Sequence, residues 1–133
     1  MYDVIAIGEL LIDFATQSAD AEGYPTMKAS PGGAPGNFLA ALSRYGARTA
    51  FLGKVGDDAF GKLLLETMQK AGIETRGIVV DDSVFTTLAF VTFSPEGDRT
   101  FSFARKPGAD TRLSFEEIDC SMLDEASVVH FGT

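Results

Sequence analysis

The sequence has 133 residues, of which 45% are hydrophobic and 23% are charged, so it is long and apolar enough to form one small domain or part of a larger one. Its composition is not that of a disordered or fibrous protein. The formal net charge of -8 argues against general binding to nucleic acids or anionic membranes, because both require a basic surface.

The first third of the chain predicts three strands before any helix. Residues 2–8 are almost all apolar, which is typical of a strand covered on both faces. Residues 12–17 and 27–30 are short and mixed, and they predict two minor strands joined by an exposed loop. Residues 30–36 (SPGGAPG) hold three glycines and two prolines, so we expect an irregular loop there.

The middle of the chain predicts alternating helices and strands. A helix begins at Asn37 and ends at Gly46, and residues 49–55 form a strand. A second helix, capped by Asp57 or Asp58, runs to about residue 70, and residues 76–80 form another short strand. This order predicts a parallel sheet with right-handed crossovers.

The last third of the chain changes in pattern. Residues 86–93 and 99–105 flank a compact turn, which predicts an antiparallel hairpin separate from the parallel sheet. Residues 114–119 predict a capped helical turn, and residues 127–133 another buried strand. Because no helix follows to cover that strand, we expect the rest of an α/β domain to be missing.

Two features of the sequence indicate its compartment. Cys120 and His130 are the one cysteine and the one histidine, so neither an internal disulfide nor a zinc site can form. Asp3 occupies the position of a positive leader region, and Glu9 and Asp13 interrupt the apolar run behind it. We therefore expect a soluble, cytoplasmic chain with no membrane span.

Glycines and polar side chains at strand ends are the first candidates for a ligand site. Gly36 and the Asn37 amide suit hydroxyl groups better than phosphates, since an amide both donates and accepts; a tight loop with an ordinary Asn cap explains them equally well. Asp13 follows the first strand, at the edge where open α/β sheets bind ligands. Taken alone, it is also consistent with a solvated loop acid.

Later candidates have plain structural alternatives. Lys54 is either a ligand residue or a solvated charge at a strand end. Phe101 and Phe103 alternate on one face of the hairpin, and Arg105 follows where the strand ends, so it contacts either a ligand or solvent. His130 is most simply a core histidine, and Cys120 is most simply a small packing residue.

Three segments together resemble the ribokinase/PfkB family of carbohydrate kinases. They are IAIGELLIDF at residues 5–14, GGAPGNFLAALSRYGARTAFLGKVGDDAFG at residues 32–61, and FSFARKPGAD at residues 101–110. The third segment is most similar to the fructokinase branch. The resemblance covers essentially the whole chain, residues 1–133.

The resemblance implies a ribokinase-like α/β fold, with a mostly parallel sheet flanked by helices and a small β-sheet lid. Residues near 12–16, 26–30 and 86–104 would form the lid. The resemblance assigns these residues to sugar binding: Asp13, Gly32, Gly33, Asn37, Phe103 and Arg105. The aspartate and the asparagine would hold hydroxyls, the paired glycines would let the sugar lie against backbone, and the two lid residues would cover it.

The family's second signature, an Asp-Thr-x-Gly-Ala-Gly-Asp type of segment, has no counterpart in this sequence. Family members are about twice as long, and that segment supplies the catalytic aspartate and the phosphate site. We therefore expect the catalytic residue, and the sites for ATP, Mg²⁺ and K⁺, in a C-terminal half absent from these residues.

The resemblance implies ATP-dependent phosphorylation of a sugar hydroxyl, with fructose as the expected sugar. The alternatives are a kinase of the same family acting on ribose, 2-keto-3-deoxygluconate or a nucleoside, and a truncated sugar-binding module without catalysis. We expect these residues alone to be inactive, and the whole protein to form a homodimer through its lid.

Overall fold

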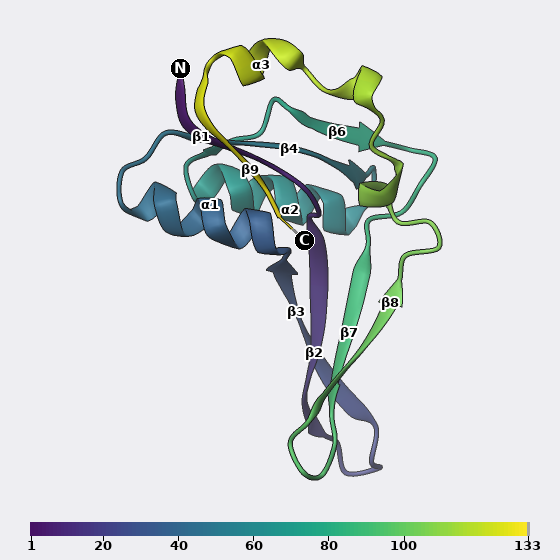
Figure 1. Ribbon diagram of the computed structural model, residues 1–133. Helices are drawn as coiled ribbons and strands as arrows, with labels where there is room; N and C mark the ends of the chain where they lie inside the picture. Colours follow the sequence, from purple (N-terminus) through teal and green to yellow (C-terminus); the bar gives the residue numbers. More distant parts are fainter. Residues whose placement is uncertain (133) are drawn as a thin grey trace.

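The computed structural model describes residues 1–132, which form two sheets (Figure 1). The first sheet has the strand order β5-β4-β1-β9, with β6 also paired to β4, and all its pairings are parallel. Its strands are β1 (Tyr2–Ile7), β4 (Thr49–Gly56), β5 (Ile73–Glu74), β6 (Ile78–Asp81) and β9 (Ala126–Phe131). The predicted parallel sheet is therefore confirmed.

The second sheet has four strands in the order β3-β2-β7-β8 and extends away from the first sheet and its helices (Figure 1). Its strands are β2 (Leu11–Ala19), β3 (Pro25–Gly32), β7 (Leu88–Phe93) and β8 (Arg99–Ala104). β2 and β7 pair in parallel at its centre, and each outer strand is antiparallel to its neighbour. The predicted hairpin is β7 and β8, and it lies outside the parallel sheet as expected.

Helices cover both faces of the first sheet. The helical segments are α1 (Ala34–Arg44), α2 (Ala59–Lys70), α3 (Cys120–Asp124) and the two 3-10 turns η1 (Ala109–Arg112) and η2 (Phe115–Glu117). Leu39 of α1 and Leu64 of α2 pack with Phe51 of β4 on one face, while Met122 of α3 packs with Leu52 on the other. None of the helices described in residues 1–132 has the length and apolarity needed to cross a membrane.

The carboxylate of Asp58 joins the two sheets. Its Oδ1 accepts hydrogen bonds from the backbone N–H groups of Phe60 and Gly61, both at 2.9 Å, so it caps α2 as predicted for one of the two candidate aspartates. Its Oδ2 accepts from the Thr86 backbone N–H at 2.8 Å, just before β7 begins. One side chain therefore fixes both the start of α2 and the entry into the second sheet.

Residues 30–36 do not form the irregular loop that we expected. β3 continues through Gly32, and α1 begins two residues later with Gly33 as its N-cap. Pro31 lies on an outer strand of its sheet and Pro35 in the first turn of α1, where a missing backbone N–H costs little. The prolines and glycines therefore mark an abrupt strand-to-helix junction.

The structure also corrects three expectations about burial. β9 pairs with β1 at the edge of the first sheet, and Val128 and Phe131 are exposed, so it is not a buried strand. His130 is half-buried against the ring of Phe38, at 4.4 Å between centroids, and Cys120 is exposed. An apolar run predicts a strand, but its burial depends on neighbours that the run does not specify.

Candidate functional site

One face of the second sheet brings distant residues together. Asp13 of β2 pairs with Ala89 of β7, and Ala89 pairs with Phe103 of β8. Paired residues on adjacent strands share a face, so the carboxylate and the ring lie on either side of a small residue. Phe101 lies on the same face two residues earlier, and its ring stacks on that of Phe103 with centroids 6.2 Å apart. This confirms the predicted alternation.

A pocket of about 580 Å³ lies where this face meets the start of α1, and we call it the β2–β8 pocket. Its lining residues are Glu9, Leu11, Asp13, Gly33, Ala34, Phe101, Phe103 and Arg105. The structure thus brings together four of the six predicted site residues. The volume is that of a small-molecule site, and the lining combines aromatic rings with a few charged groups.

Glycine is required where α1 approaches the turn after β1. Gly33 has φ 109°, and a Cβ there would lie 2.5 Å from the carbonyl oxygen of Glu9. The carboxylate of Glu9 accepts a hydrogen bond from the Ala34 backbone N–H at 3.2 Å. Gly32 is buried, and a side chain there would collide with the carboxylate of Asp13. Gly32 therefore makes room for Asp13 and does not itself line the pocket.

We expect Gly33→Ala to lower the free energy of unfolding by about 2 kcal/mol, because it adds a backbone clash to the strain of a positive φ. The matched control is Gly46→Ala, since Gly46 has φ 87° and a Cβ there would meet nothing within 4 Å. Urea denaturation of both variants measures the difference. Equal losses would show that the contact with Glu9 contributes nothing.

Asp13 has a carboxylate that is half-buried and free of protein donors. Within residues 1–132, no side-chain or backbone group donates a hydrogen bond to it, and no cation pairs with it. Burial therefore raises the pKa of Asp13 above its ordinary value of 3.8. Such a carboxylate is suited to accept hydrogen bonds from ligand hydroxyls.

Arg105 lines the pocket but is not free. Its Nε and Nη2 donate to the two carboxylate oxygens of Asp110, at 3.3 and 2.5 Å. Sequence reasoning missed Asp110 and Glu9 as parts of the site. Glu9 follows β1 directly, so the rule that selected Asp13 at a strand end could have selected it too. No residue pattern around Asp110 indicates that it belongs to the site.

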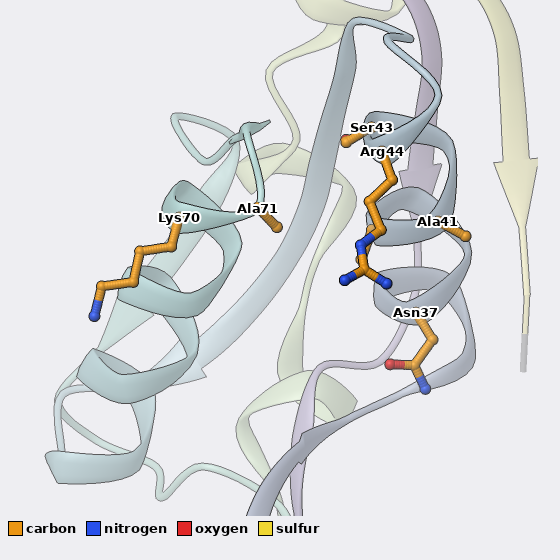
Figure 2. A pocket seen from close by; sticks show the side chains of 7 residues that line it. Asn37, Ala41, Ser43, Arg44, Lys70 and Ala71 are labelled. Carbon is orange, nitrogen blue, oxygen red and sulfur yellow. The ribbon is translucent and has the colours of Figure 1, made fainter.

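Asn37 lies outside the β2–β8 pocket. It is an exposed residue of the first turns of α1, and it lines a second pocket of about 580 Å³ between α1 and the end of α2. Figure 2 shows its side chain at the start of α1, in the pocket that Arg44 and Lys70 also line. The structure thus does not place Asn37 with Asp13.

Lys54 is neither a solvated charge nor a free ligand residue. It is 3% exposed, and its Nζ donates to Glu117 at 2.5 Å and to Asp81 and the Arg112 carbonyl at 3.1 Å each. Burial acts to lower the pKa of Lys54, but the hydrogen bonds to Glu117 and Asp81 outweigh it and raise the pKa above its ordinary value. The ammonium group joins β4 to β6 and to the segment after β8.

The sequence profile of the pfkB family of carbohydrate kinases matches residues 1–133. The chain belongs to this family. Membership confirms the resemblance found from the three sequence segments. The crystal structure of a PfkB protein from Polaromonas sp. superposes on 98% of the chain with a TM-score of 0.87, which agrees with the two-sheet fold.

Relatives of the fructokinase branch are similar in sequence and structure. Fructokinase-1 of Zea mays is 42% identical over 133 residues, covering 98% of this chain. The crystal structure of a fructokinase from Xylella fastidiosa has a TM-score of 0.91 at 34% identity over 98% of the chain, and the same enzyme with bound ATP has a TM-score of 0.89. The chain spans 41% of the maize protein and 41% and 42% of the two crystallised chains.

Metal ions in proteins are commonly held by clusters of histidine, cysteine or carboxylate side chains. Residues 1–132 hold no group of three histidine, cysteine or carboxylate side chains that could bind a metal ion together. We derive no step through Mg²⁺ or K⁺.

Proposed function

We propose that these residues form the sugar-binding part of a kinase that transfers a phosphoryl group from ATP to a hydroxyl of fructose. The observation that carries the proposal is the donor-free carboxylate of Asp13, which lines a pocket together with two aromatic rings. The fructokinase relatives in sequence and structure support fructose as the sugar, and the ATP-bound relative supports ATP as the donor.

Each lining group has a role in holding a sugar. The carboxylate of Asp13 accepts hydrogen bonds from two adjacent hydroxyls, and the rings of Phe101 and Phe103 pack against the C–H face of the sugar. The backbone at Gly33 permits close approach, and Arg105 donates to a further hydroxyl. The hydroxyl contact of Asn37 is also part of the proposal, but it rests on the resemblance alone.

The second sheet acts as a lid in this proposal. Its strands carry Asp13 and Phe103 on one face, so closure over the sugar would exclude water and limit the hydrolysis of ATP. We also propose that two copies pair through this sheet as a homodimer. The exposed ring of Phe93, toward the outer end of β7, supports that pairing.

ATP supplies the phosphoryl group, and its transfer depends on positioning and charge stabilisation. We assign no residue of this chain to ATP or to the aspartate that deprotonates the sugar hydroxyl. Since the chain spans 41% of its maize relative, we place those groups outside these residues. The 133 residues alone are accordingly expected to bind sugar without phosphorylating it.

The test compares sugars on the protein that carries this sequence. ATP-dependent phosphorylation is measured with fructose, ribose and 2-keto-3-deoxygluconate, and we expect the highest kcat/KM with fructose. Preference for ribose or 2-keto-3-deoxygluconate would assign another kinase of the family. Calorimetric sugar binding with no turnover on any sugar would favour a non-catalytic binding module.

Sugar binding is expected to depend on pH through Asp13. Hydroxyl donors favour the ionised carboxylate, so affinity should be constant near neutral pH and fall by about tenfold per pH unit below the raised pKa of Asp13. Calorimetric titration of fructose from pH 7 to pH 4 measures this. Asp13→Asn should show no such fall, and an equal fall in both proteins would assign the effect to another group.

A further inference from the structure

A buried carboxylate pairs with the arginine that lines the pocket. Asp110, in η1, has a fully buried side chain, whereas Arg105 at the pocket rim is 38% exposed. The two form a side-on ion pair in which each oxygen of the carboxylate accepts one guanidinium N–H. The guanidinium keeps further N–H groups for a ligand, but its positive charge is compensated.

The carboxylate of Asp110 is itself held in place. The hydroxyl of Thr87, a residue with no exposed surface, hydrogen-bonds to its Oδ1. The Ala109 backbone N–H donates to the carbonyl of Phe85 at 2.9 Å, which fixes η1 against the entry of β7. A side chain at Gly108 would collide with the Thr87 hydroxyl, so the turn fits closely. Asp110 therefore cannot swing away from Arg105 without breaking this packing.

The charges around the pocket favour an uncharged ligand. Of the described residues that line it, Glu9 and Asp13 are carboxylates and Arg105 is the one cation. Because Asp110 neutralises that cation, the carboxylate of a sugar acid would meet two like charges and no free positive charge. A neutral sugar meets instead acceptors and donors that match its hydroxyls.

We propose that Asp110 is a positioning residue that determines the class of substrate, because it holds and neutralises Arg105 so that the pocket selects uncharged sugars over sugar acids. This inference rests on the proposed function and deepens it. It also gives a physical reason for the expected preference for fructose over 2-keto-3-deoxygluconate, which carries a carboxylate.

The experiment measures the dissociation constants of fructose and 2-keto-3-deoxygluconate by calorimetry, on the protein that carries this sequence, at low and high salt. We expect the wild type to bind fructose about 100-fold more tightly than the acid, and Asp110→Asn to reduce this ratio to about 10-fold or less. In Asp110→Asn, binding of the acid should weaken with added salt, because it now depends on an uncompensated charge.

Two further variants make the result specific. Asp98→Asn changes the net charge equally at an exposed turn and should keep the wild-type ratio. Thr87→Val removes the hydroxyl that holds Asp110, and it should reduce the preference for fructose over the acid by about threefold. This variant serves as the test if Asp110→Asn does not fold.

Three outcomes overturn this account. Wild-type protein that binds the sugar acid as tightly as fructose refutes the inference without any variant. An unchanged ratio in both Asp110→Asn and Thr87→Val also refutes it, while leaving the sugar-kinase proposal intact. Failure of the wild type to bind any neutral sugar refutes the proposed function itself, and the inference with it.

Discussion

Asp13→Asn is expected to lower kcat/KM for sugar phosphorylation, in the protein that carries this sequence, by about 100- to 1,000-fold. The substitution replaces a carboxylate that accepts from two hydroxyls by an amide that offers one acceptor and two donors. One sugar hydroxyl then faces an amide N–H and can no longer donate at that position, and both hydroxyls lose their hydrogen bonds to a charged acceptor. Because no group of residues 1–132 engages the carboxylate, the loss belongs to the ligand and not to the fold.

The control for this prediction separates charge from contact. Asp98→Asn makes the same change in net charge at an exposed turn of the same sheet, and its kcat/KM should stay within about twofold of wild type. The midpoint of urea unfolding should be the same in both variants as in the wild type. An Asp13→Asn protein that keeps a third or more of the wild-type kcat/KM would remove Asp13 from the sugar site.

Lys54→Met is expected to lower the free energy of unfolding by about 2 to 4 kcal/mol. The substitution keeps the length of the side chain but removes the ammonium group, so Asp81 and Glu117 lose their shared cation and the Arg112 carbonyl loses a donor. The two carboxylates are partly exposed, at 20% and 31%, which moderates the loss. Urea denaturation followed by circular dichroism measures the change.

Lys62→Met is the matched control, because Lys62 is 71% exposed and its pair with Asp57 spans 3.5 Å. Lys62→Met should lower the free energy of unfolding by less than about 0.5 kcal/mol.

Acid unfolding of Lys54→Met gives a second test of the same ion pairs. Hydrogen bonds from Ser83, and then from Lys54, lower the pKa of Asp81 to about 2, so this group stabilises the fold above about pH 4 and the contribution is lost between pH 4 and 2. Between pH 4 and 2, the free energy of unfolding should therefore fall less in Lys54→Met than in the wild type. An equal fall in both proteins would contradict the account.

The sequence predicts the parts of this molecule that depend on local pattern. Residues 2–8 are almost all apolar, which indicates a strand covered on both faces, and the spacing of Phe101 and Phe103 indicates a shared face. The position of Asp13 soon after β1 predicts a place at the ligand-binding edge of the sheet, and the structure places it in β2, where it lines the β2–β8 pocket. The prediction of an irregular loop at residues 30–36 was wrong, because glycine and proline also occur where a strand turns sharply into a helix.

The parts that could not be predicted depend on partners distant in the chain. Lys54 lies 63 positions before Glu117, and nothing near Lys54 in the sequence indicates that its ammonium group is buried. Asp110 is only five residues from Arg105, but the Thr87 hydroxyl that also contacts its carboxylate lies 23 positions earlier in the chain. Charges of this kind resemble surface residues until the tertiary structure is known, since burial of a charge requires a specific partner.

The most direct test of the central claim is a crystal structure of the protein that carries this sequence with fructose bound. We predict that fructose occupies the β2–β8 pocket, with two hydroxyls at about 2.6 to 3.0 Å from the carboxylate oxygens of Asp13 and the ring of Phe103 against its carbon face. Fructose bound in the pocket between α1 and α2, or bound without contact to Asp13, would contradict the account.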